Sequence, residues 1–297
     1  RRGLLGGLEI GSSIKSIVQY NPKVVKDGVS FFEAAEIMKV SYFNHLPIVD
    51  KNYKLRGLYV LEFMKKPMVR KNQVIIMAGG MGKRLLPLTK TKPKPLIKAF
   101  GKPMLEQLLL NLKGSKYVKK FVVATSKNQK DDAIENFCKN KRILFYRGSE
   151  KNVLSRFKKI IDLYKPKLII RLTADNPFVD SILLDYMLDQ YFKYYKGFDY
   201  INNVENSNFP YGLYLEIFTS KALNVAVKNS SHSDLEHVTM YIRRNKNKFK
   251  TAVIKSNEKF KYKRLTVDNE KDFIFAERLM KKLQRKDFFS YNDLLKK

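Results

Sequence analysis

The sequence contains no tryptophan, one cysteine and only three histidines among its 297 residues. The single cysteine, Cys138, excludes an intramolecular disulfide and any cysteine-rich metal site, and it suits a reducing cytoplasm. We see no zinc site among so few histidines. No apolar run approaches the roughly 20 residues of a membrane-spanning helix, and no export signal follows the two arginines at the start.

Acidic side chains are also scarce, with 28 Asp and Glu against 59 Lys and Arg, which gives a net charge of +31. Such a balance is common in proteins that bind nucleic acids. Here the cations are mostly lysines spread along the chain, without an arginine-rich tract. We therefore expect no nucleic-acid partner, although a basic nucleic-acid binder stays open as an alternative. A basic surface would still attract nucleotides and sugar phosphates.

The stretch 74–105 predicts a site for a polyphosphate. Its apolar start, residues 74–77, is typical of a buried strand. Three glycines follow: Gly79, Gly80 and Gly82. Glycine lets backbone N–H groups approach phosphate oxygens without a Cβ in the way. Two cations of the loop, Arg84 and Lys94, can neutralise the charge that remains.

This loop resembles the signature loop of sugar-phosphate nucleotidyltransferases, which join a nucleoside triphosphate to a sugar phosphate and release pyrophosphate. The resemblance rests on four segments: MAGGMGKRL at 77–85, PLT at 87–89, PKPL at 93–96 and GKP at 101–103. It implies that Arg84 and Lys94 are catalytic and that Ala78 and the three glycines bind the nucleotide.

Strand and helix patterns alternate after the loop, with apolar strands at 120–125, 143–146 and 168–172. This order predicts an α/β fold with a mostly parallel sheet and helices on both faces. Ligands of such sheets bind at the carboxyl ends of strands, where the glycine loop and Asp175 both lie. Further along, we expect a helix over 234–244, a strand over 264–267 and a helix over 270–283.

From Phe121 onward the chain resembles the cytidylyltransferases of spore-coat and surface polysaccharide synthesis. The matching segments, in family order, include VVATS at 122–126, RGSE at 147–150, RLTADNP at 171–177, EHVT at 236–239 and RLTVD at 264–268. The resemblance implies a Rossmann-like, glycosyltransferase-A-like nucleotidyltransferase domain over 72–297. The glycine loop, by contrast, looks more like that of sugar-1-phosphate enzymes, so the two resemblances disagree about the nucleotide.

The second resemblance also implies roles for residues outside the loop. The nucleotide-binding candidates are Arg147, Gly148, Ser149 and Asp175. The acceptor-binding candidates are Arg156, Glu216, Glu236 and His237, the last two at the start of a helix. Asp175 and Asp268 are the candidate ligands of Mg²⁺, which prefers carboxylate, water and phosphate oxygens. A structural role without ligand stays open for each of these residues. Either aspartate could cap the N-terminus of a helix, Arg156 could lie on a solvated helix face, and His237 could only pack against its neighbours or cap a helix.

Residues 1–71 form a separate small α+β unit that resembles one CBS repeat, especially at HLPIVD (45–50) and LRGL (55–58). Such repeats work in pairs that often bind adenine nucleotides, and residues 1–5 look like the last helical turn of a preceding repeat. Because the chain also lacks an initiator methionine, we expect it to begin inside a longer protein. Half of the usual cleft is absent, so a docking or dimerisation unit without ligand is favoured over an adenine-nucleotide site.

Together these patterns predict a Mg²⁺-dependent nucleotidyltransferase that activates a sugar for surface polysaccharide synthesis, with CTP as the favoured nucleotide. The acceptor would be a sugar or a sugar phosphate, and we expect a homodimer. A guanylyl-, uridylyl- or thymidylyltransferase acting on a sugar-1-phosphate is the alternative within the same class. A regulatory protein that senses adenine nucleotides through its CBS-like unit, with a degenerate transferase domain, is the alternative from another class.

Overall fold

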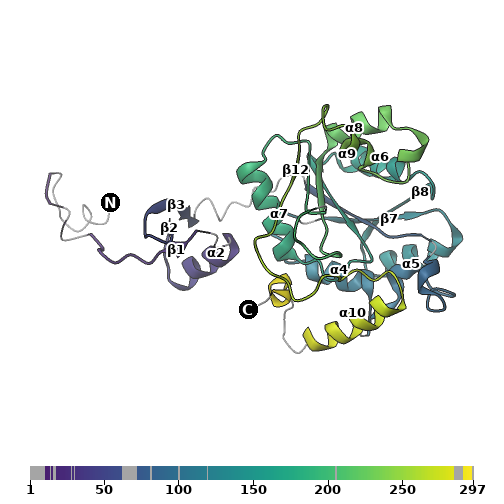
Figure 1. The fold of residues 1–297 in the computed structure, drawn as a ribbon, viewed down its shortest axis with the longest axis horizontal. Helices are drawn as coiled ribbons and strands as arrows, with labels where there is room; N and C mark the ends of the chain where they lie inside the picture. The colour runs from purple at the N-terminus through teal and green to yellow at the C-terminus, as the bar shows by residue number, and fades with distance from the viewer. Residues whose placement is uncertain are drawn as a thin grey trace. The chain divides into compact units, whose positions relative to one another are not determined.

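The computed structural model describes residues 11–61, 72–283 and 290–295, apart from the single positions 14, 16, 17, 28, 30, 81, 100, 119 and 205. The chain divides into two compact units, Arg1–Pro67 and Met68–Lys297 (Figure 1). Residues 1–5, for which we predicted a helical turn, lie outside the described residues.

The first unit is a three-stranded sheet with one helix. Its elements are β1 (Val25–Lys26), α2 (Phe31–Val40), β2 (His45–Val49) and β3 (Leu55–Val60). β2 lies in the middle, parallel to β1 and antiparallel to β3. Ala34 and Met38 of α2 are buried together with Val25, Leu46 and Leu61, so the core of this unit is small.

The second unit holds the remaining elements. Its strands are β4 (Asn72–Met77), β5 (Lys98–Ala99), β6 (Lys102–Pro103), β7 (Phe121–Ser126), β8 (Leu144–Gly148), β9 (Leu168–Thr173), β10 (Tyr200–Asn202), β11 (Glu216–Thr219) and β12 (Thr251–Val253). Its α-helices are α4 (Met104–Leu112), α5 (Asp132–Asn140), α6 (Val153–Tyr164), α7 (Ser181–Tyr194), α8 (Ser220–Asn229), α9 (Met240–Arg244) and α10 (Glu270–Leu283). Short 3₁₀ turns are η2 (Lys83–Leu85), η3 (Lys94–Leu96), η4 (Gln129–Asp131), η5 (His232–Asp234) and η6 (Tyr291–Leu294).

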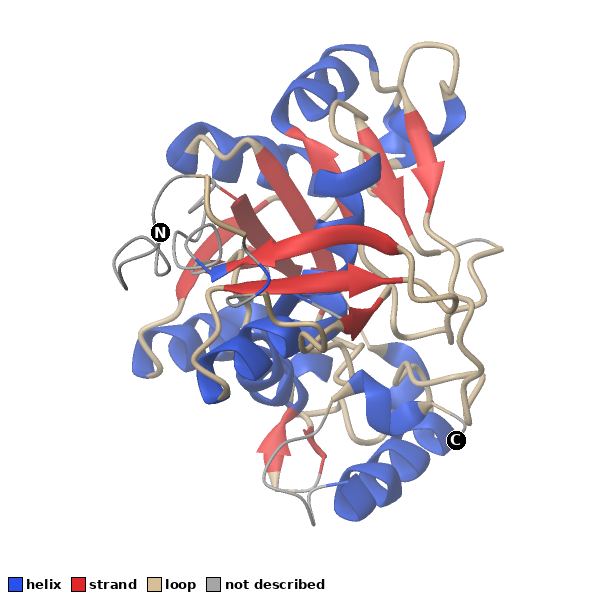
Figure 2. Cartoon of the chain, turned by 90° about the vertical axis from the view of Figure 1, so that its left-hand side faces the viewer, coloured by secondary structure: helices blue, strands red, loops and turns tan. Residues whose placement is uncertain are grey.

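Seven of these strands form one sheet in the order β12-β10-β11-β9-β4-β7-β8. Every neighbouring pair is parallel except the two pairs that involve β11, which is antiparallel to β10 and β9. Figure 2 shows the strands with helices on either side of them. The predicted mostly parallel α/β sheet is confirmed.

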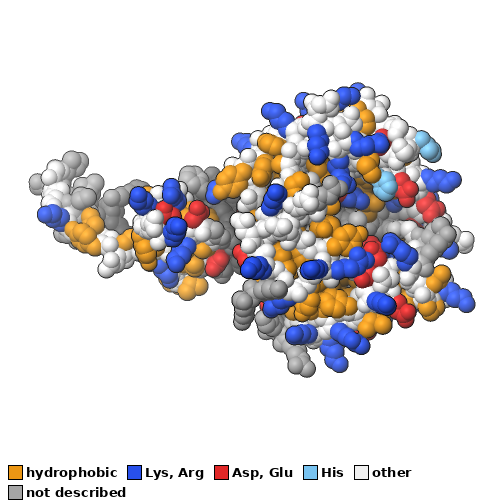
Figure 3. Space-filling view, viewed as in Figure 1, with side chains coloured by type: hydrophobic (Ala, Val, Ile, Leu, Met, Phe, Trp, Pro, Cys, Tyr) orange, Lys and Arg blue, Asp and Glu red, His pale blue; other side chains and the backbone are white. Residues whose placement is uncertain are grey.

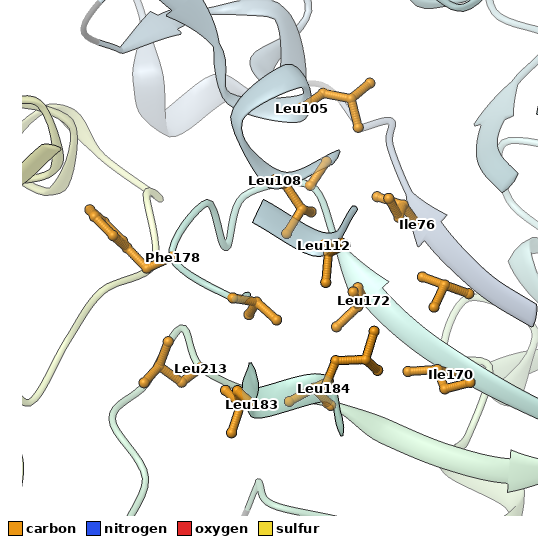
Figure 4. Packing of buried hydrophobic residues seen from close by; sticks show 14 of the residues in the cluster. Ile76, Leu105, Leu108, Leu112, Ile170, Leu172, Phe178, Leu183, Leu184 and Leu213 are labelled. Carbon is orange, nitrogen blue, oxygen red and sulfur yellow. The ribbon is translucent and has the colours of Figure 1, made fainter. Parts of the chain in front are cut away.

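Two apolar cores cover the two faces of this sheet, because consecutive residues of a strand point to opposite sides. Ile76, Ile170 and Leu172 belong to the core under α4, α5, α7 and α10, whereas Ile75 and Ile169 belong to the core under α6, α8 and α9. The first set of helices lies largely below the sheet in Figure 1, and α6, α8 and α9 lie above it. Figure 4 shows Leu108 and Leu112 of α4 beside Ile76 and Leu172 of the strands on the first face.

The predicted helix over 234–244 is confirmed over Met240–Arg244 and wrong over the residues before them. Residues 235–239 form turns between η5 and α9, and the helix begins only at Met240. Tertiary hydrogen bonds explain the interruption: the carbonyl of Leu235 accepts from the N–H of Leu154, and the Thr239 hydroxyl donates to Glu216 in the sheet. These bonds outweigh the helical pattern of the segment.

The predicted strand over 264–267 is also wrong, since the segment makes only one isolated bridge, between Arg264 and Tyr211. The N–H groups of Leu265 and Thr266 both donate to the carbonyl of Tyr211. The N–H of Val267 donates to a different partner, the carbonyl of Asp175. The segment therefore has no continuous partner strand, although it ties the chain before Asp268 to the end of β9.

In the described ranges, no helix is both long and apolar enough to cross a membrane. Figure 3 shows lysine and arginine side chains dispersed among apolar, acidic and other side chains on the face in view.

Gly212 allows the 264–267 segment to approach Tyr211, and this close approach can be tested. A Cβ at Gly212 would lie well under 3.0 Å from backbone atoms of Leu265 and Thr266, and the residue has a φ of +107°. We expect Gly212→Ala to lower the free energy of unfolding by roughly 3 kcal/mol or more, because backbone cannot move aside as a side chain can. Urea unfolding followed by circular dichroism measures this, since tryptophan fluorescence is absent.

Gly197 provides the matched control, because it also has a positive φ, of +94°, but its Cβ would meet nothing within 4 Å. Gly197→Ala is expected to cost only about 1 kcal/mol of backbone strain. An equal loss of unfolding free energy in the two variants would show that the close contact of Gly212 with Leu265 and Thr266 does not matter for stability.

Candidate functional site

The glycine loop leaves the carboxyl end of β4 between two neighbouring strands. The N–H of Ala78 donates to the carbonyl of Ala124 at 3.0 Å, and the N–H of Ala174 donates to the carbonyl of Met77 at 2.9 Å. Gly80 and Gly82 then adopt φ values of +114° and +59°. These are left-handed conformations that favour glycine, so the local sequence explains the turn.

Position 82 also requires glycine because a side chain there would have no room. A Cβ there would lie 2.9 Å from Cγ2 of Thr89, whose hydroxyl donates to the carbonyl of Gly82 at 2.8 Å. This hydrogen bond folds the loop back on itself. Further along the chain, the 3₁₀ turn η3 carries Lys94.

Lys94 lies between two carboxylates. Its Nζ donates to Oδ2 of Asp175 at 2.7 Å and to Oδ1 of Asp268 at 2.9 Å. The lysine side chain is only 16% exposed, so water weakens these ion pairs less than it weakens surface pairs. Because both carboxylate oxygens contact the same nitrogen, they lie close enough for a single cation to contact both.

The two aspartates reach this position from distant parts of the chain. Asp175 lies in the turn after β9, and Asp268 follows the segment whose Val267 N–H donates to the carbonyl of Asp175. Helix capping does not account for Asp268, because Asn269 accepts the hydrogen bond from the Asp272 N–H at the start of α10. Asp180, not Asp175, accepts from the N–H of Leu183 at the start of α7.

Charges around Asp268 keep it ionised. Burial alone would raise the pKa of its carboxyl group, but the hydrogen bond and charge of Lys94, with the charges of Arg84 and Arg264, lower that pKa below its ordinary value. Arg84 is largely exposed and its Nη2 lies 3.4 Å from the carboxylate. Asp272 in turn accepts two hydrogen bonds from Arg264 and one from the N–H of Asp268, which orients the carboxylate.

These groups surround a pocket of about 350 Å³. Its lining residues, all of which had been predicted from the sequence, are Gly79, Gly80, Gly82, Arg84, Lys94, Asp175 and Asp268. The pocket combines a backbone turn and two cations, which suit an anion, with two carboxylates, which suit a cation. A polyphosphate bound together with a divalent cation would match both the anion-binding groups and the carboxylates.

A larger surface hollow of about 580 Å³ lies elsewhere, next to residues 198–199 and 246–251. These residues precede β10 and β12, at the sheet edge opposite the glycine loop. The hollow lacks paired carboxylates and a glycine turn, so we place the candidate site at the smaller pocket.

The nucleotide candidates at the end of β8 do not line that pocket. Arg147 forms ion pairs with Glu135 and Asp132 and donates to the carbonyl of Ser126. Ser149 accepts a hydrogen bond from the N–H of Asn152. Gly148 is buried, and a Cβ there would collide with the Arg156 side chain.

Arg156 does not lie on a solvated helix face, as one of the alternatives had it. It is only 5% exposed, and its Nη1 would lie 3.8 Å from a Cβ at Gly79, directly behind the glycine loop. Burial lowers the pKa of its guanidinium, and the charges of Asp131 and Glu150 oppose that shift. Its Nη2 donates to the carbonyl of Glu150, whereas its buried Nε has no partner among the described residues.

The acceptor candidates are divided between the interior and the surface. Glu216 is buried and accepts hydrogen bonds from Arg171, Tyr200 and Thr239. Glu236 and His237 are exposed on the turn before α9 rather than at the start of a helix. Thr239 connects the two groups, because it belongs to this turn and bonds to Glu216.

Sequence reasoning missed the partners that hold the candidate residues. Arg171, Arg264 and Asp272 were only parts of matched segments, without roles of their own. The signal for Arg171 was present, because a single arginine interrupts the otherwise apolar strand LIIRLT. Nothing in the sequence pairs Asp272 with Arg264 and Asp268.

The sequence profile of one family, Cytidylyltransferase, matches residues 89–295. An uncharacterised protein of Methanocaldococcus jannaschii is 38% identical over 202 residues, which cover 67% of this chain and 79% of that protein. A spore coat polysaccharide biosynthesis protein of Bacillus subtilis is 35% identical over 178 residues, which cover 59% of this chain and 72% of that protein.

One solved structure, a cytidylyltransferase from Leptospira borgpetersenii, superposes with a TM-score of 0.68 and 29% identity. The match covers 76% of this chain and 92% of that one. The predicted Rossmann-like nucleotidyltransferase fold is therefore confirmed.

The dependence of Asp268 on Lys94 gives a direct test of the site's electrostatics. In Lys94→Met we expect the pKa of Asp268 to rise from below its ordinary value of 3.8, because burial then prevails over the lost hydrogen bond and charge. A ¹³C NMR titration of the aspartate carboxyl groups measures this change. Lys92→Met removes an exposed cation from the same loop and serves as the control. An unchanged Asp268 pKa in Lys94→Met would contradict the assigned ion pair.

Proposed function

The chain belongs to the cytidylyltransferase family, and from this premise we propose that it transfers CMP from CTP to a sugar or sugar phosphate for surface polysaccharide synthesis, with release of pyrophosphate. In this reaction an oxygen of the acceptor forms a bond to the α-phosphorus. The bond from the α-phosphorus to the oxygen that bridges it to the β-phosphorus breaks, and pyrophosphate leaves with the electron pair. A sugar hydroxyl that attacks loses its proton to solvent, whereas a sugar phosphate attacks through an oxygen that is already deprotonated.

One observation carries the proposal: Lys94, Asp175 and Asp268 meet opposite the glycine loop in a single pocket. Nucleotidyl transfer needs the triphosphate to be held, its charge to be offset and the acceptor to be placed in line. The turn at Gly79 to Gly82 offers backbone N–H groups to the phosphates, and Arg84 offers an exposed cation beside them. Lys94 would stabilise the negative charge that develops on the leaving pyrophosphate.

The carboxylate pair fits a magnesium ion. Two carboxylates whose oxygens contact one nitrogen can share one cation, and magnesium is usually held by one or two carboxylates together with phosphates and water. No cluster of three or more His, Cys, Asp or Glu side chains suits a metal ion in the part of the chain that the structure describes. When bound, magnesium would neutralise phosphate charge, while Asp175 and Asp268 hold it and Lys94 turns to the phosphates.

CTP is favoured over other triphosphates because the family match covers most of the second unit. A guanylyl-, uridylyl- or thymidylyltransferase on a sugar-1-phosphate stays the alternative, supported by the form of the glycine loop. A CBS-type role of the first unit, with adenine nucleotide binding or dimerisation, also stays a prediction.

A pyrophosphate-release assay with each of the four triphosphates and a panel of sugar acceptors tests the proposed function. We expect release with CTP and with at least one acceptor, and little release with the other triphosphates. Release with UTP, GTP or dTTP instead would establish the alternative nucleotide. If no combination of triphosphate and acceptor releases pyrophosphate and the chain binds adenine nucleotides tightly, the result would support the alternative of a regulatory protein.

Asp175→Ala tests the assigned carboxylate. We expect turnover to fall by about 10³-fold or more, because the variant cannot hold the cation that offsets phosphate charge. The fold is expected to persist, since the backbone carbonyl of residue 175 still accepts from Val267. Mn²⁺ binding in the presence of CTP, followed by electron paramagnetic resonance, is expected to weaken as well.

Asp162→Ala is the control, because that aspartate is half exposed on α6 and, among the described residues, pairs only with Lys158. It is expected to keep normal turnover and Mn²⁺ binding. Normal turnover by Asp175→Ala would disprove the site assignment.

A further inference from the structure

Lys94 occupies the point between two carboxylates at which the proposed function requires a magnesium ion. Its Nζ lies 2.7 Å from Oδ2 of Asp175 and 2.9 Å from Oδ1 of Asp268. Magnesium binds oxygens at roughly 2.1 Å, so each carboxylate oxygen would move inward by only about 0.7 Å to hold the ion instead. The ammonium group and the metal ion therefore compete for one position.

Among the described residues, no other cation bridges the two carboxylates. Arg84 contacts only Asp268, at 3.4 Å, and its side chain is 76% exposed. Arg264 also contacts only Asp268 of this pair, through the other oxygen, at 3.2 Å. Lys94, by contrast, is largely buried and contacts both. Removal of the lysine ammonium would therefore open the shared position, while Asp268 would keep a cationic partner.

The side chain of Lys94 begins on the phosphate side of the pocket. A Cβ at Gly82 would lie 3.4 Å from Cβ of Lys94, so the lysine stem starts beside the glycine turn. Its other end, the ammonium group, reaches the carboxylates. The lysine stem is a flexible chain of four carbons. Rotation of the side chain alone can therefore carry the ammonium from the carboxylates to a phosphate on the turn.

The backbone that carries Lys94 is held in place. Pro93 and Pro95 flank the lysine, and each proline fixes its own φ. The N–H of Leu96 donates to the carbonyl of Pro93, and the N–H of Ile97 donates to the carbonyl of Lys94. Pro95 and Ile97 are buried, so the turn η3 is anchored in the core. A fixed backbone with a flexible stem leaves the ammonium group as the part that can move.

We propose that Lys94 is an internal substitute for the divalent cation and thereby makes the metal ion and the triphosphate bind cooperatively. Before a triphosphate binds, the ammonium closes the position between Asp175 and Asp268 to the metal ion. A triphosphate on the glycine turn offers the ammonium a second anionic partner, and the two carboxylates then take up the metal ion. The inference rests on the proposed function and adds how its site is regulated, since each ligand must raise the affinity for the other equally.

Metal binding without nucleotide tests this substitution directly. Mn²⁺, which shares the preference of Mg²⁺ for carboxylate oxygens, is titrated into the full chain, and free Mn²⁺ is followed by electron paramagnetic resonance. We expect Mn²⁺ to bind Lys94→Met at least about tenfold more tightly than the wild type, because methionine leaves both carboxylates to the metal ion. Equal Mn²⁺ affinity of the two chains would overturn the inference.

Two controls separate occupation of the position from net charge. Arg84→Met removes an exposed cation that contacts Asp268, and it should change the Mn²⁺ affinity by no more than about twofold. Lys94→Arg keeps a cation that pairs with carboxylates and should bind Mn²⁺ as weakly as the wild type. If Arg84→Met strengthens Mn²⁺ binding as much as Lys94→Met does, net charge explains the effect and the inference fails.

A second neutral variant covers the case in which Lys94→Met does not fold. Lys94→Gln keeps an amide that can donate a hydrogen bond to one carboxylate, and its Mn²⁺ affinity should exceed that of the wild type about threefold or more. A glutamine variant with wild-type Mn²⁺ affinity would overturn the inference as well.

The cooperativity is measured in the wild type by differential scanning calorimetry, with inorganic tripolyphosphate as the probe. Millimolar Mg²⁺ alone should leave Tm unchanged, and Mg²⁺ together with tripolyphosphate should raise Tm by more than the two separate shifts combined. In Lys94→Met, Mg²⁺ alone should raise Tm. Additive shifts in the wild type would contradict cooperative binding.

These measurements need no turnover, so they separate the inference from the proposed function. Cooperative binding that depends on Lys94, in a chain that releases no pyrophosphate, would support the inference and reject the proposed function. Pyrophosphate release by a chain whose Mn²⁺ affinity is the same with and without Lys94 would support the proposed function and overturn the inference.

Discussion

The contact of Lys94 with Asp175 and Asp268 is the interaction on which the site depends. Two carboxylates close together in a partly buried pocket repel each other, and burial by itself would raise the pKa of Asp268. Lys94 offsets that repulsion, and Arg84 and Arg264 add positive charge around Asp268. The cluster thus lowers the pKa of Asp268 and holds two carboxylates side by side at the edge of an apolar sheet. In the proposed reaction, the same lysine would be available to phosphate once another cation takes its place between the carboxylates.

The fold supplies the geometry for this contact. Parallel strands β4 and β9 are neighbours, so the glycine loop after β4 and the turn after β9 lie side by side. The returning chain before α10 then bonds through Val267 to the carbonyl of Asp175, which brings in Asp268. Gly212 permits that return, because its missing side chain leaves room for the backbone of Thr266. Between β9 and β11, Arg171 and Glu216 form a second charged group.

Much of the site could be predicted because its signals are local. The glycine loop, with Arg84 and Lys94, is one continuous segment, and Gly82 meets a steric demand of Thr89 within the loop itself. The mostly parallel sheet followed from short apolar strands that alternate with helical patterns. The predictions that failed lie where contacts between distant segments prevail: residues 235–239 form turns because Leu235 and Thr239 bond to α6 and to the sheet.

The sequence by itself determined the alternating α/β order, the glycine turn after the first strand of the sheet and, through resemblance, the class of reaction. Tertiary structure alone decided which side chains meet: that Asp175 and Asp268 share Lys94, that Arg156 is buried behind Gly79, and that Glu216 is occupied by Arg171. The physical reason is that strand pairing and side-chain direction, not separation along the chain, set these distances. A one-dimensional pattern records which residue types are present, whereas the charge and burial of each depend on neighbours that only the folded sheet brings together.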